Sequence, residues 1–155
     1  MKFLILHGPN VNLLGKRRTD IYGMVPYEQL NAVLMQYASS FGVELVIHQS
    51  NREGELVDLL HKFATGEKAD PTKVQAVVFN PGAYAHTSIA LRDAVETCTI
   101  PVIEVHMSNT LAREEFRQES LIAAVATGQI QGFGVLSYFM AMFVLAKQFG
   151  LDVRG

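Results

Sequence analysis

The sequence predicts an α/β domain with a doubly wound sheet of parallel strands. Short apolar runs alternate with segments of helical periodicity from one end of the chain to the other, a pattern typical of strands joined by crossover helices. Some runs are almost continuously apolar, as in VQAVVF at 74–79, which indicates strands covered by helices on both faces. A length of 155 residues fits one domain, so we expect residues 1–155 to form a single unit.

Five strands are expected in chain order, the last from the weakest pattern: residues 2–6, 43–48, 74–79, 101–105 and 130–135. Five strands in this rhythm predict a flavodoxin-like five-stranded parallel sheet with helices on both faces. In such a sheet, ligands bind beyond the carboxyl ends of the strands, where the strand order reverses between the first and third strands.

Helices are expected between the strands because apolar residues recur there at intervals of three and four. The first helical face comprises Leu30, Val33, Leu34, Tyr37, Ala38 and Phe41. A second comprises Leu56, Leu59, Leu60 and Phe63, following a possible helix cap at Ser50 or Asn51. A last helix is suggested by Leu136, Met140, Phe143, Val144 and Leu151.

Composition narrows the class of function. Hydrophobic residues make up 49% and charged residues 18% of the chain, values typical of a folded globular domain. The net charge of −2 argues against a nucleic-acid binder, which needs a basic face. One cysteine, Cys98, permits no internal disulfide and argues against a cysteine-based metal site. The apolar run at residues 3–6 is too short for a membrane span or a signal peptide, so cytoplasm is the expected location.

Three segments follow the predicted strands on the ligand side of the sheet. The first, residues 7–23, is longer than an ordinary βα loop, and long loops in compact domains are commonly lids or binding loops. Gly15 and Gly23 would suit its hinges. The second, residues 80–88, brings amide, imidazole and hydroxyl groups to a helix start, where Thr87 or Ser88 is expected as the cap.

The third segment, residues 104–109, places Glu104 and His106 on the same face of a strand, because side chains alternate with period two. A carboxylate beside an imidazole can orient it and favour its protonated form. We therefore interpret His106 as a candidate general acid with Glu104 as its partner. Basic residues near these loops, namely Arg17, Arg18, Arg113 and Arg117, suit a small acidic ligand.

The sequence contains no motif of nucleophilic, nucleotide-dependent or metal-dependent catalysis. There is no nucleophile elbow, no glycine-rich nucleotide loop and no metal-ligand spacing. The residues alone therefore predict an α/β enzyme that moves protons on an anionic small molecule. Two alternatives remain at this point: a flavodoxin-like flavin-binding or receiver module, and an inactive scaffold that assembles through apolar surface near Met140, Met142 and Phe143. We expect these last three residues to be core instead.

The chain also resembles the type II 3-dehydroquinate dehydratases over nearly its full length. The resemblance rests on GPN at 8–10, NLLG at 12–15, YG at 22–23, QSN at 49–51, NPGAY at 80–84, HTS at 86–88, ALRD at 90–93, EVH at 104–106, SN at 108–109, RE at 113–114 and FR at 116–117. So many blocks in one order are specific to a family. The resemblance implies removal of water from 3-dehydroquinate without cofactor, metal or Schiff base.

Residue roles follow from the same resemblance. It implies that Tyr22 is the base at C2, that His106 protonates the departing C1 hydroxyl, and that Arg17 is a lid arginine activating the tyrosine. Asn10 resembles the asparagine that stabilises the enolate through a water. Substrate contacts are implied for Asn80, His86, Ser108 and Arg117, for the backbone N–H groups of Met107 and Ser108, for Asp93 toward a neighbouring subunit's site, and for Arg113 near the tyrosine.

The resemblance further implies a homododecamer built from trimers, with no nucleic-acid or membrane partner. Two departures are visible: Arg18-Thr19 where the family often has Glu-Pro, and His7 where it often has Asn. Neither position is a proposed catalytic one.

Overall fold

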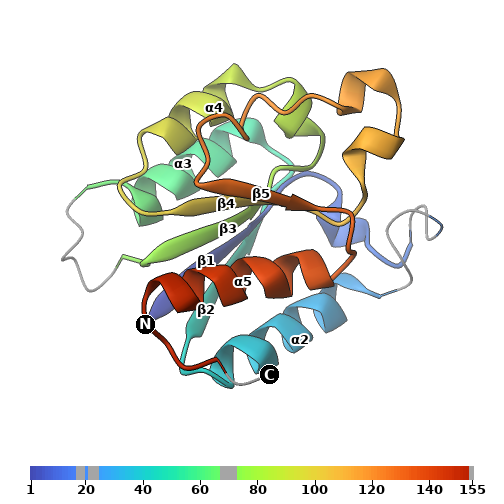
Figure 1. Cartoon of the computed structure of the whole chain (residues 1–155). Coiled ribbons are helices and arrows are strands. Elements are labelled where there is room, and N and C mark those ends of the chain that lie inside the picture. Colours follow the sequence, from blue (N-terminus) through green and yellow to red (C-terminus); the bar gives the residue numbers. More distant parts are fainter. Residues whose placement is uncertain (17–19, 21–24, 67–72, 154–155) are drawn as a thin grey trace.

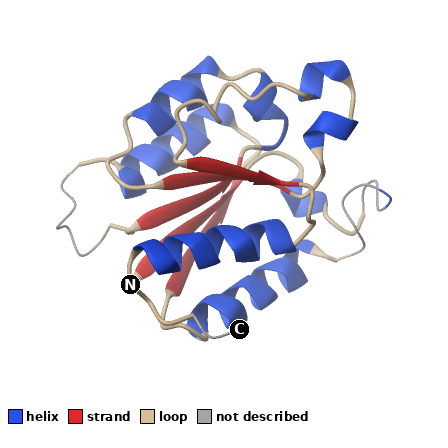
Figure 2. Cartoon of the chain, viewed as in Figure 1, coloured by secondary structure: helices blue, strands red, loops and turns tan. Residues whose placement is uncertain are grey.

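The computed structural model describes residues 1–16, 20, 25–66 and 73–153. These residues form a five-stranded sheet in the order β2-β1-β3-β4-β5, and every neighbouring pair is parallel. The strands are β1 (Lys2–His7), β2 (Glu44–Gln49), β3 (Ala76–Asn80), β4 (Val102–His106) and β5 (Gly128–Gln131). Figure 1 shows the sheet in the middle of three layers, and Figure 2 separates its strands from the helices. The predicted flavodoxin-like fold is confirmed.

Helices cover both faces of the sheet (Figure 1). Two of them, α2 (Tyr27–Ser39) and α5 (Leu136–Gln148), lie on one face, and α3 (Glu53–Ala64) and α4 (Ile89–Glu96) lie on the other. Short 3-10 turns follow three strands: η1 (Val11–Leu13) after β1, η2 (Gly82–His86) after β3, and η3 (Thr110–Ala112) with η4 (Glu115–Arg117) after β4.

The alternation of side chains along β1 divides the core in two. Phe3 and Ile5 pack against α2 and α5, whereas Leu4 and Leu6 pack against α3 and α4, and all four are fully buried. This two-sided burial explains why the strand is apolar at every position rather than at every second one.

Two local expectations need correction, and a third is confirmed. The last strand ends at Gln131, three residues after Gly128, and not at residue 135. Phe133, inside the expected strand, is exposed and lies in the turn that leads to α5. The N-cap position of α3 is Arg52 rather than Ser50 or Asn51, although the Ser50 hydroxyl accepts a hydrogen bond from the Arg52 N–H at 3.0 Å. The expected cap at Ser88 is confirmed, since its hydroxyl accepts from Leu91 N–H at 2.9 Å.

The buried face of α5 also differs from the expected one. Tyr138, Ala141, Met142 and Leu145 are fully buried, so the expectation of a core residue is confirmed for Met142. Phe143 is exposed, and with it Leu136 and Val144 from the predicted stripe. The helix is apolar nearly all round, and a pattern of that kind does not say which side faces the sheet. Within the described part of the chain, no helix is long and apolar enough to cross a membrane.

Candidate active site

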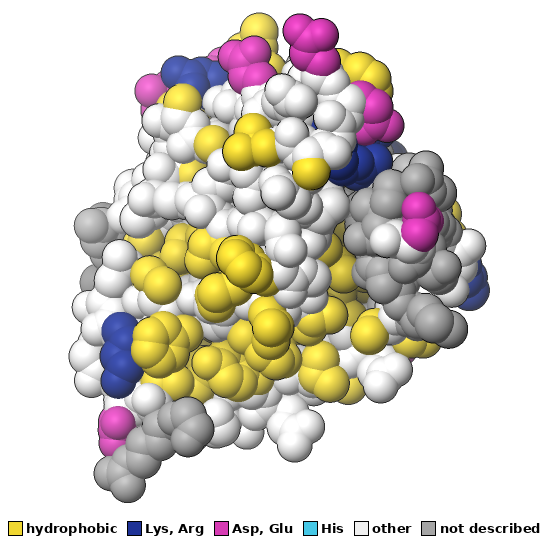
Figure 3. All heavy atoms as spheres, turned by 45° about the vertical axis from the view of Figure 1, so that its right-hand side comes forward, with side chains coloured by type: hydrophobic (Ala, Val, Ile, Leu, Met, Phe, Trp, Pro, Cys, Tyr) yellow, Lys and Arg dark blue, Asp and Glu magenta, His cyan; other side chains and the backbone are white. Residues whose placement is uncertain are grey.

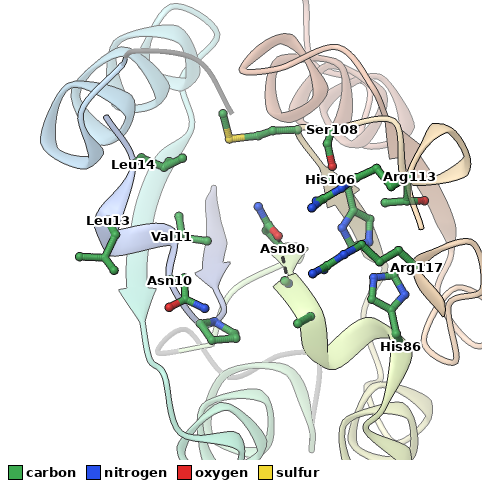
Figure 4. A pocket seen from close by; sticks show the side chains of 15 residues that line it. Asn10, Val11, Leu13, Leu14, Asn80, His86, His106, Ser108, Arg113 and Arg117 are labelled. Carbon is green, nitrogen blue, oxygen red and sulfur yellow. Dashed lines mark hydrogen bonds between the residues drawn. The ribbon is translucent and has the colours of Figure 1, made fainter. Parts of the chain in front are cut away.

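A pocket lies at the carboxyl ends of the strands, in the region that the strand order predicts. Its walls come from the turn after β1, the turn after β3 and the segment after β4 (Figure 4). It encloses about 710 Å³ of space, part of it open to solvent. In Figure 4, Asn10, Val11, Leu13 and Leu14 lie on one side, Asn80 lies in the middle, and His86, His106, Arg113 and Arg117 lie on the other.

The turns after β1 and β3 pack backbone against backbone. Gly8 N–H donates to the Asn80 carbonyl at 2.7 Å, and a Cβ atom at position 8 would lie 2.6 Å from the Pro81 carbonyl carbon. Gly82 has a φ of +58°, a conformation open to glycine at little cost. The two turns therefore hold one side of the pocket as a single rigid unit.

Asn10 sits in this unit with a left-handed backbone, φ +66°, which asparagine tolerates better than most residues. Its N–H donates to Asn51 Oδ1 at 2.9 Å, and the Gln49 amide donates to the same oxygen at 3.0 Å. These bonds set the backbone of Asn10 and direct its side chain to the pocket wall. The QSN segment after β2 thus supports the site without lining it.

His106 and Glu104 form the strongest polar pair of the site. Glu104 is fully buried and His106 nearly so, and His106 Nε2 lies 2.6 Å from Glu104 Oε1. Ser120 Oγ lies 2.8 and 2.9 Å from the two carboxylate oxygens, and Gln129 Nε2 donates to Oε1 at 3.2 Å. Because the carboxylate is held on several sides, it fixes the orientation of the imidazole.

The Ser120 hydroxyl donates its proton to Glu104, because its other two partners are backbone N–H groups, which are themselves donors. The N–H groups of Ile122 and Ala123 donate to Ser120 Oγ at 3.2 and 3.1 Å. The hydroxyl therefore ties the carboxylate to the turn at the start of the segment that leads to β5. Neither Ser120 nor Gln129 was expected from the sequence.

The basic groups lie on the same wall as His106, opposite Asn10 (Figure 4). Glu114 Oε2 lies 3.0 Å from Arg117 Nε and 3.5 Å from Arg113 Nε, so one carboxylate holds both guanidinium groups. Its own backbone hydrogen bond, followed by the two arginines, lowers the pKa of Glu114. Two guanidinium groups on one wall favour an anionic ligand.

His86 lies beside His106 on this wall. Its Nδ1 donates to the Glu119 carbonyl at 2.6 Å, so Nε2 of the neutral ring is an acceptor. The His86 and His106 rings are nearly parallel, with centroids 6.2 Å apart. The pocket therefore combines a buried histidine–carboxylate pair, a second imidazole and two guanidinium groups. Among the described residues, no group of three or more His, Cys, Asp and Glu side chains is arranged as metal ligands.

Most of the site residues expected from the sequence meet at this pocket. Those that line it are Asn10, Asn80, His86, His106, Met107, Ser108, Arg113 and Arg117. Glu104 lies directly behind His106. Arg17 and Tyr22 lie outside the described residues. Asp93 is exposed on α4 and does not line the pocket of its own chain.

Comparisons with known proteins agree on one family. The family model described as Dehydroquinase class II matches residues 1–146. The chain is 54% identical to the 3-dehydroquinate dehydratase of Pelotomaculum thermopropionicum, over 97% of this chain and 99% of that protein. It is 48% identical to that of Caldicellulosiruptor bescii, over 94% and 97%.

Solved structures give the same result. The type II dehydroquinase from Propionibacterium acnes superimposes with a TM-score of 0.86 at 38% identity, covering 94% of this chain and 96% of that one. The type II dehydroquinase from Butyrivibrio crossotus has a TM-score of 0.86 at 41% identity, covering 94% and 97%.

Proposed function

Since the chain belongs to the class II dehydroquinases and is a type II 3-dehydroquinate dehydratase of the shikimate pathway, we propose that Tyr22 and His106 carry out its elimination step. The Tyr22 phenolate takes the proton from C2, which converts the C3 ketone into its enolate. The C1–O bond then breaks, the oxygen takes a proton from His106, and water leaves as the C1–C2 double bond forms. One observation carries the assignment of the acid: the buried His106–Glu104 pair on the wall of the pocket.

Glu104 supports the acid by holding His106 through Nε2, which leaves Nδ1 to exchange a proton with the pocket. A carboxylate partner stabilises the imidazolium before transfer and orients it throughout. Without a positioned acid, the hydroxyl would depart as hydroxide, a much poorer leaving group. General acid catalysis of this kind contributes roughly 10²–10⁴-fold to a rate.

The base needs help from cations. A tyrosine with a pKa near 10 is phenolate in only about one molecule in a thousand at neutral pH. Neighbouring cations lower such a pKa by about 1–3 units. The proposed activators of Tyr22 are Arg17 and Arg113. Arg17 belongs to the same segment as Tyr22, residues 7–23, and Arg113 lies on the pocket wall. Arg17 also stabilises the charge that develops in the transition state.

The remaining wall residues hold the substrate. Asn10 stabilises the enolate through a water, a role supported by its fixed backbone at the pocket. Arg117, Ser108 and the N–H groups of Met107 and Ser108, together with Asn80 and His86, hold the substrate carboxylate and ring hydroxyls. The cationic wall opposite the apolar Val11 and Leu14 is in keeping with a small acidic substrate.

Assembly completes the proposal. A homododecamer built from trimers would bring Asp93 of one chain, exposed on α4, to a neighbour's pocket. Support comes from apolar residues that the fold leaves exposed around α5, namely Phe133, Leu136, Phe143 and Val144. Figure 3 shows hydrophobic side chains gathered over the lower half of one face, where α5 and α2 lie. Residues 1–155 act as one catalytic domain in this assembly.

The test is formation of the conjugated enone product from 3-dehydroquinate, followed spectroscopically with purified protein. Tyr22→Phe and His106→Ala should each lower kcat by roughly 10²–10⁴-fold while substrate still binds. His61→Ala, which removes an exposed histidine on α3, is the matched control and should leave kcat unchanged. Near-normal turnover in either active-site variant would assign that proton transfer to another residue, and no product from the wild type would indicate an inactive scaffold.

A further inference from the structure

Four polar side chains form a continuous hydrogen-bonded chain behind the pocket. Asn31 Oδ1 on α2 lies 3.1 Å from His7 Nε2, and His7 Nδ1 lies 3.0 Å from the Tyr138 hydroxyl on α5. The Tyr138 hydroxyl in turn accepts from Asn80 Nδ2 at 2.8 Å. His7 and Tyr138 are completely buried, and only Asn80 belongs to the pocket wall.

One backbone group fixes the orientation of the Asn80 amide at the end of this chain. Gly82 N–H can only donate, and it lies 3.1 Å from an Asn80 side-chain atom, which must therefore be the oxygen Oδ1. The Asn80 amide nitrogen then donates to the Tyr138 oxygen. A buried hydroxyl proton without an acceptor is costly, and His7 Nδ1 is the acceptor that the described residues offer to Tyr138, so we assign the His7 proton to Nε2, which points to the Asn31 oxygen.

Burial keeps the two central groups in the protonation states that this order requires. Desolvation lowers the pKa of His7 to about 4, although the bond to Asn31 acts in the opposite direction. Burial also raises the pKa of the Tyr138 hydroxyl. At neutral pH the imidazole therefore has one N–H and the phenol keeps its proton. With a neutral ring and a neutral phenol, this arrangement is the one that pairs the buried O–H of Tyr138 as well as the N–H of His7.

The order of protons decides what Asn80 can offer to a ligand. An amide has two N–H donors and two oxygen lone pairs. One N–H is used by Tyr138 and one lone pair by Gly82, so one of each remains. A hydroxyl group, which both donates and accepts, can use both at once. A ketone or a carboxylate can use only the N–H. If the amide turned over, it would set its NH₂ group against the Gly82 N–H.

We propose that His7 and Tyr138 are positioning residues that lock the Asn80 amide in one orientation and so make this part of the pocket specific for a ring hydroxyl of the substrate. The inference rests on the proposed role of Asn80 in holding the substrate. It gives a purpose to the buried histidine that ends β1, which neither touches the pocket nor takes part in proton transfer.

The first experiment measures kcat and KM for 3-dehydroquinate in a double-mutant cycle of Tyr138→Phe and Asn80→Ala. Tyr138→Phe keeps the ring and removes the hydroxyl, and it should raise KM roughly tenfold, the effect of one hydrogen bond, with a smaller change in kcat. In the Asn80→Ala background, Tyr138→Phe should raise KM no further. Tyr37→Phe, on α2 and stacked against Phe139 of α5, is the matched control and should not affect KM.

The second experiment compares His7→Gln with His7→Leu. A glutamine amide can accept from Tyr138 and donate to Asn31, so His7→Gln should retain a KM within about threefold of the wild type, whereas His7→Leu should match Tyr138→Phe. The pair decides the question even if Tyr138→Phe does not fold. Equal increases in KM from Tyr138→Phe in both backgrounds, or equal KM values for the two His7 variants, would overturn the inference. Either result would leave the proposed function standing, since that is tested by product formation in the wild type and by its loss in Tyr22→Phe and His106→Ala.

Discussion

Glu104 is a buried carboxylate whose bonds account for its fixed position beside His106. The Ser120 hydroxyl lies within hydrogen-bond distance of both oxygens of this carboxylate and donates its proton to them, since the other groups bound to Ser120 Oγ are backbone N–H donors. Ser120 contacts Glu104, which in turn contacts His106, the proposed acid. Its effect on the reaction must therefore pass through Glu104 and His106.

Ser120→Ala should lower kcat about tenfold with little change in KM, because a lost hydrogen bond to a charged group loosens the acid without touching bound substrate. Steady-state kinetics of the enone product measure both constants. Ser40→Ala is the matched control, since that exposed hydroxyl binds only the Tyr37 carbonyl at the end of α2. A raised KM with unchanged kcat would show that Ser120 shapes the pocket instead of orienting the acid.

Some of these residues could be predicted from the sequence and others could not. Glu104 and His106 are two residues apart on a strand, so the period of the strand alone puts them on one face. Ser120 and Gln129 are 16 and 25 residues from Glu104, and Tyr138 is 131 residues from His7. Their contacts depend on how the layers pack. No local pattern of spacing contains that information.

His7 also links stability to pH. Its pKa is about 4 in the folded chain, against about 6.5 when unfolded. Above pH 6.5 both states are neutral at this residue. Between pH 6.5 and 4, His7 is protonated in the unfolded chain and neutral in the folded chain. The free energy of unfolding should therefore fall by about 3 kcal/mol across this window. Tyr27 and Tyr138 contact the ring at 5.5 and 5.4 Å between centroids, and neither is an anion that would offset the loss.

Urea unfolding at fixed protein concentration, repeated from pH 7.5 to 4.5, measures this loss. His7→Asn is the matched variant, because its side chain does not titrate and all other groups are shared. The difference in unfolding free energy between the two proteins should change in favour of the variant as the pH falls. Curves that remain parallel throughout would show that His7 does not remain neutral in the folded protein.

Among the elements, the strands were the most predictable and the last strand and helix the least. Residues 2–6 and 74–79 are apolar enough to require cover on both faces, and both are strands within two residues of the expected bounds. The edge strand β5 has only four residues, which alternate little in polarity. In α5 the apolar residues surround the helix, so the choice of buried face depends on Tyr138 reaching His7 and Asn80.

The contact between the turns after β1 and β3 is the element-level feature on which the pocket depends most. Gly8→Ala would set a Cβ atom 2.6 Å from Pro81 C and O, both backbone atoms, so the turns must separate. We expect a loss of about 1–3 kcal/mol in unfolding free energy, as for other overpacked sites, with a lower kcat/KM. Chemical denaturation and product formation measure the two effects.

Gly54→Ala is the control for that change. Gly54 lies exposed near the start of α3 with nothing within 4 Å of an added Cβ atom. Because alanine is the better helix former, this variant should be more stable by about 0.5–1 kcal/mol and equally active. Two Gly→Ala changes of opposite sign would separate close packing from chain flexibility. Destabilisation of equal size at both positions would contradict the packing explanation.

For the whole molecule, topology accounts for the position of the site. Since β2 lies on one side of β1 while β3 and β4 follow on the other, the connections after β1 and after β3 run to opposite faces of the sheet, and a crevice opens between them. The strands end in polar residues at this edge: His7, Gln49, Asn80, His106 and Gln131. Strand order is thus what turns residues scattered over the sequence into one pocket, and the location could be predicted before any contact was known.

The exposed face of α5 concerns the molecule beyond one chain. Phe143 and Val144 are about two-fifths exposed and Leu136 more than half, although monomers rarely leave large apolar groups clustered in solvent. If this face packs against another copy in the proposed homododecamer, Val144→Glu should desolvate a charge at the interface and reduce the assembly to smaller species. Light scattering coupled to gel filtration measures the mass.

Gln148→Glu, which places the same charge at an exposed polar position on the same helix, should leave the mass unchanged. The monomer fold buries the opposite face of α5, so far-ultraviolet circular dichroism should stay the same in both variants. A full-sized Val144→Glu assembly would place the interface elsewhere on the chain, and a monomeric wild type in an active preparation would refute the dodecamer itself.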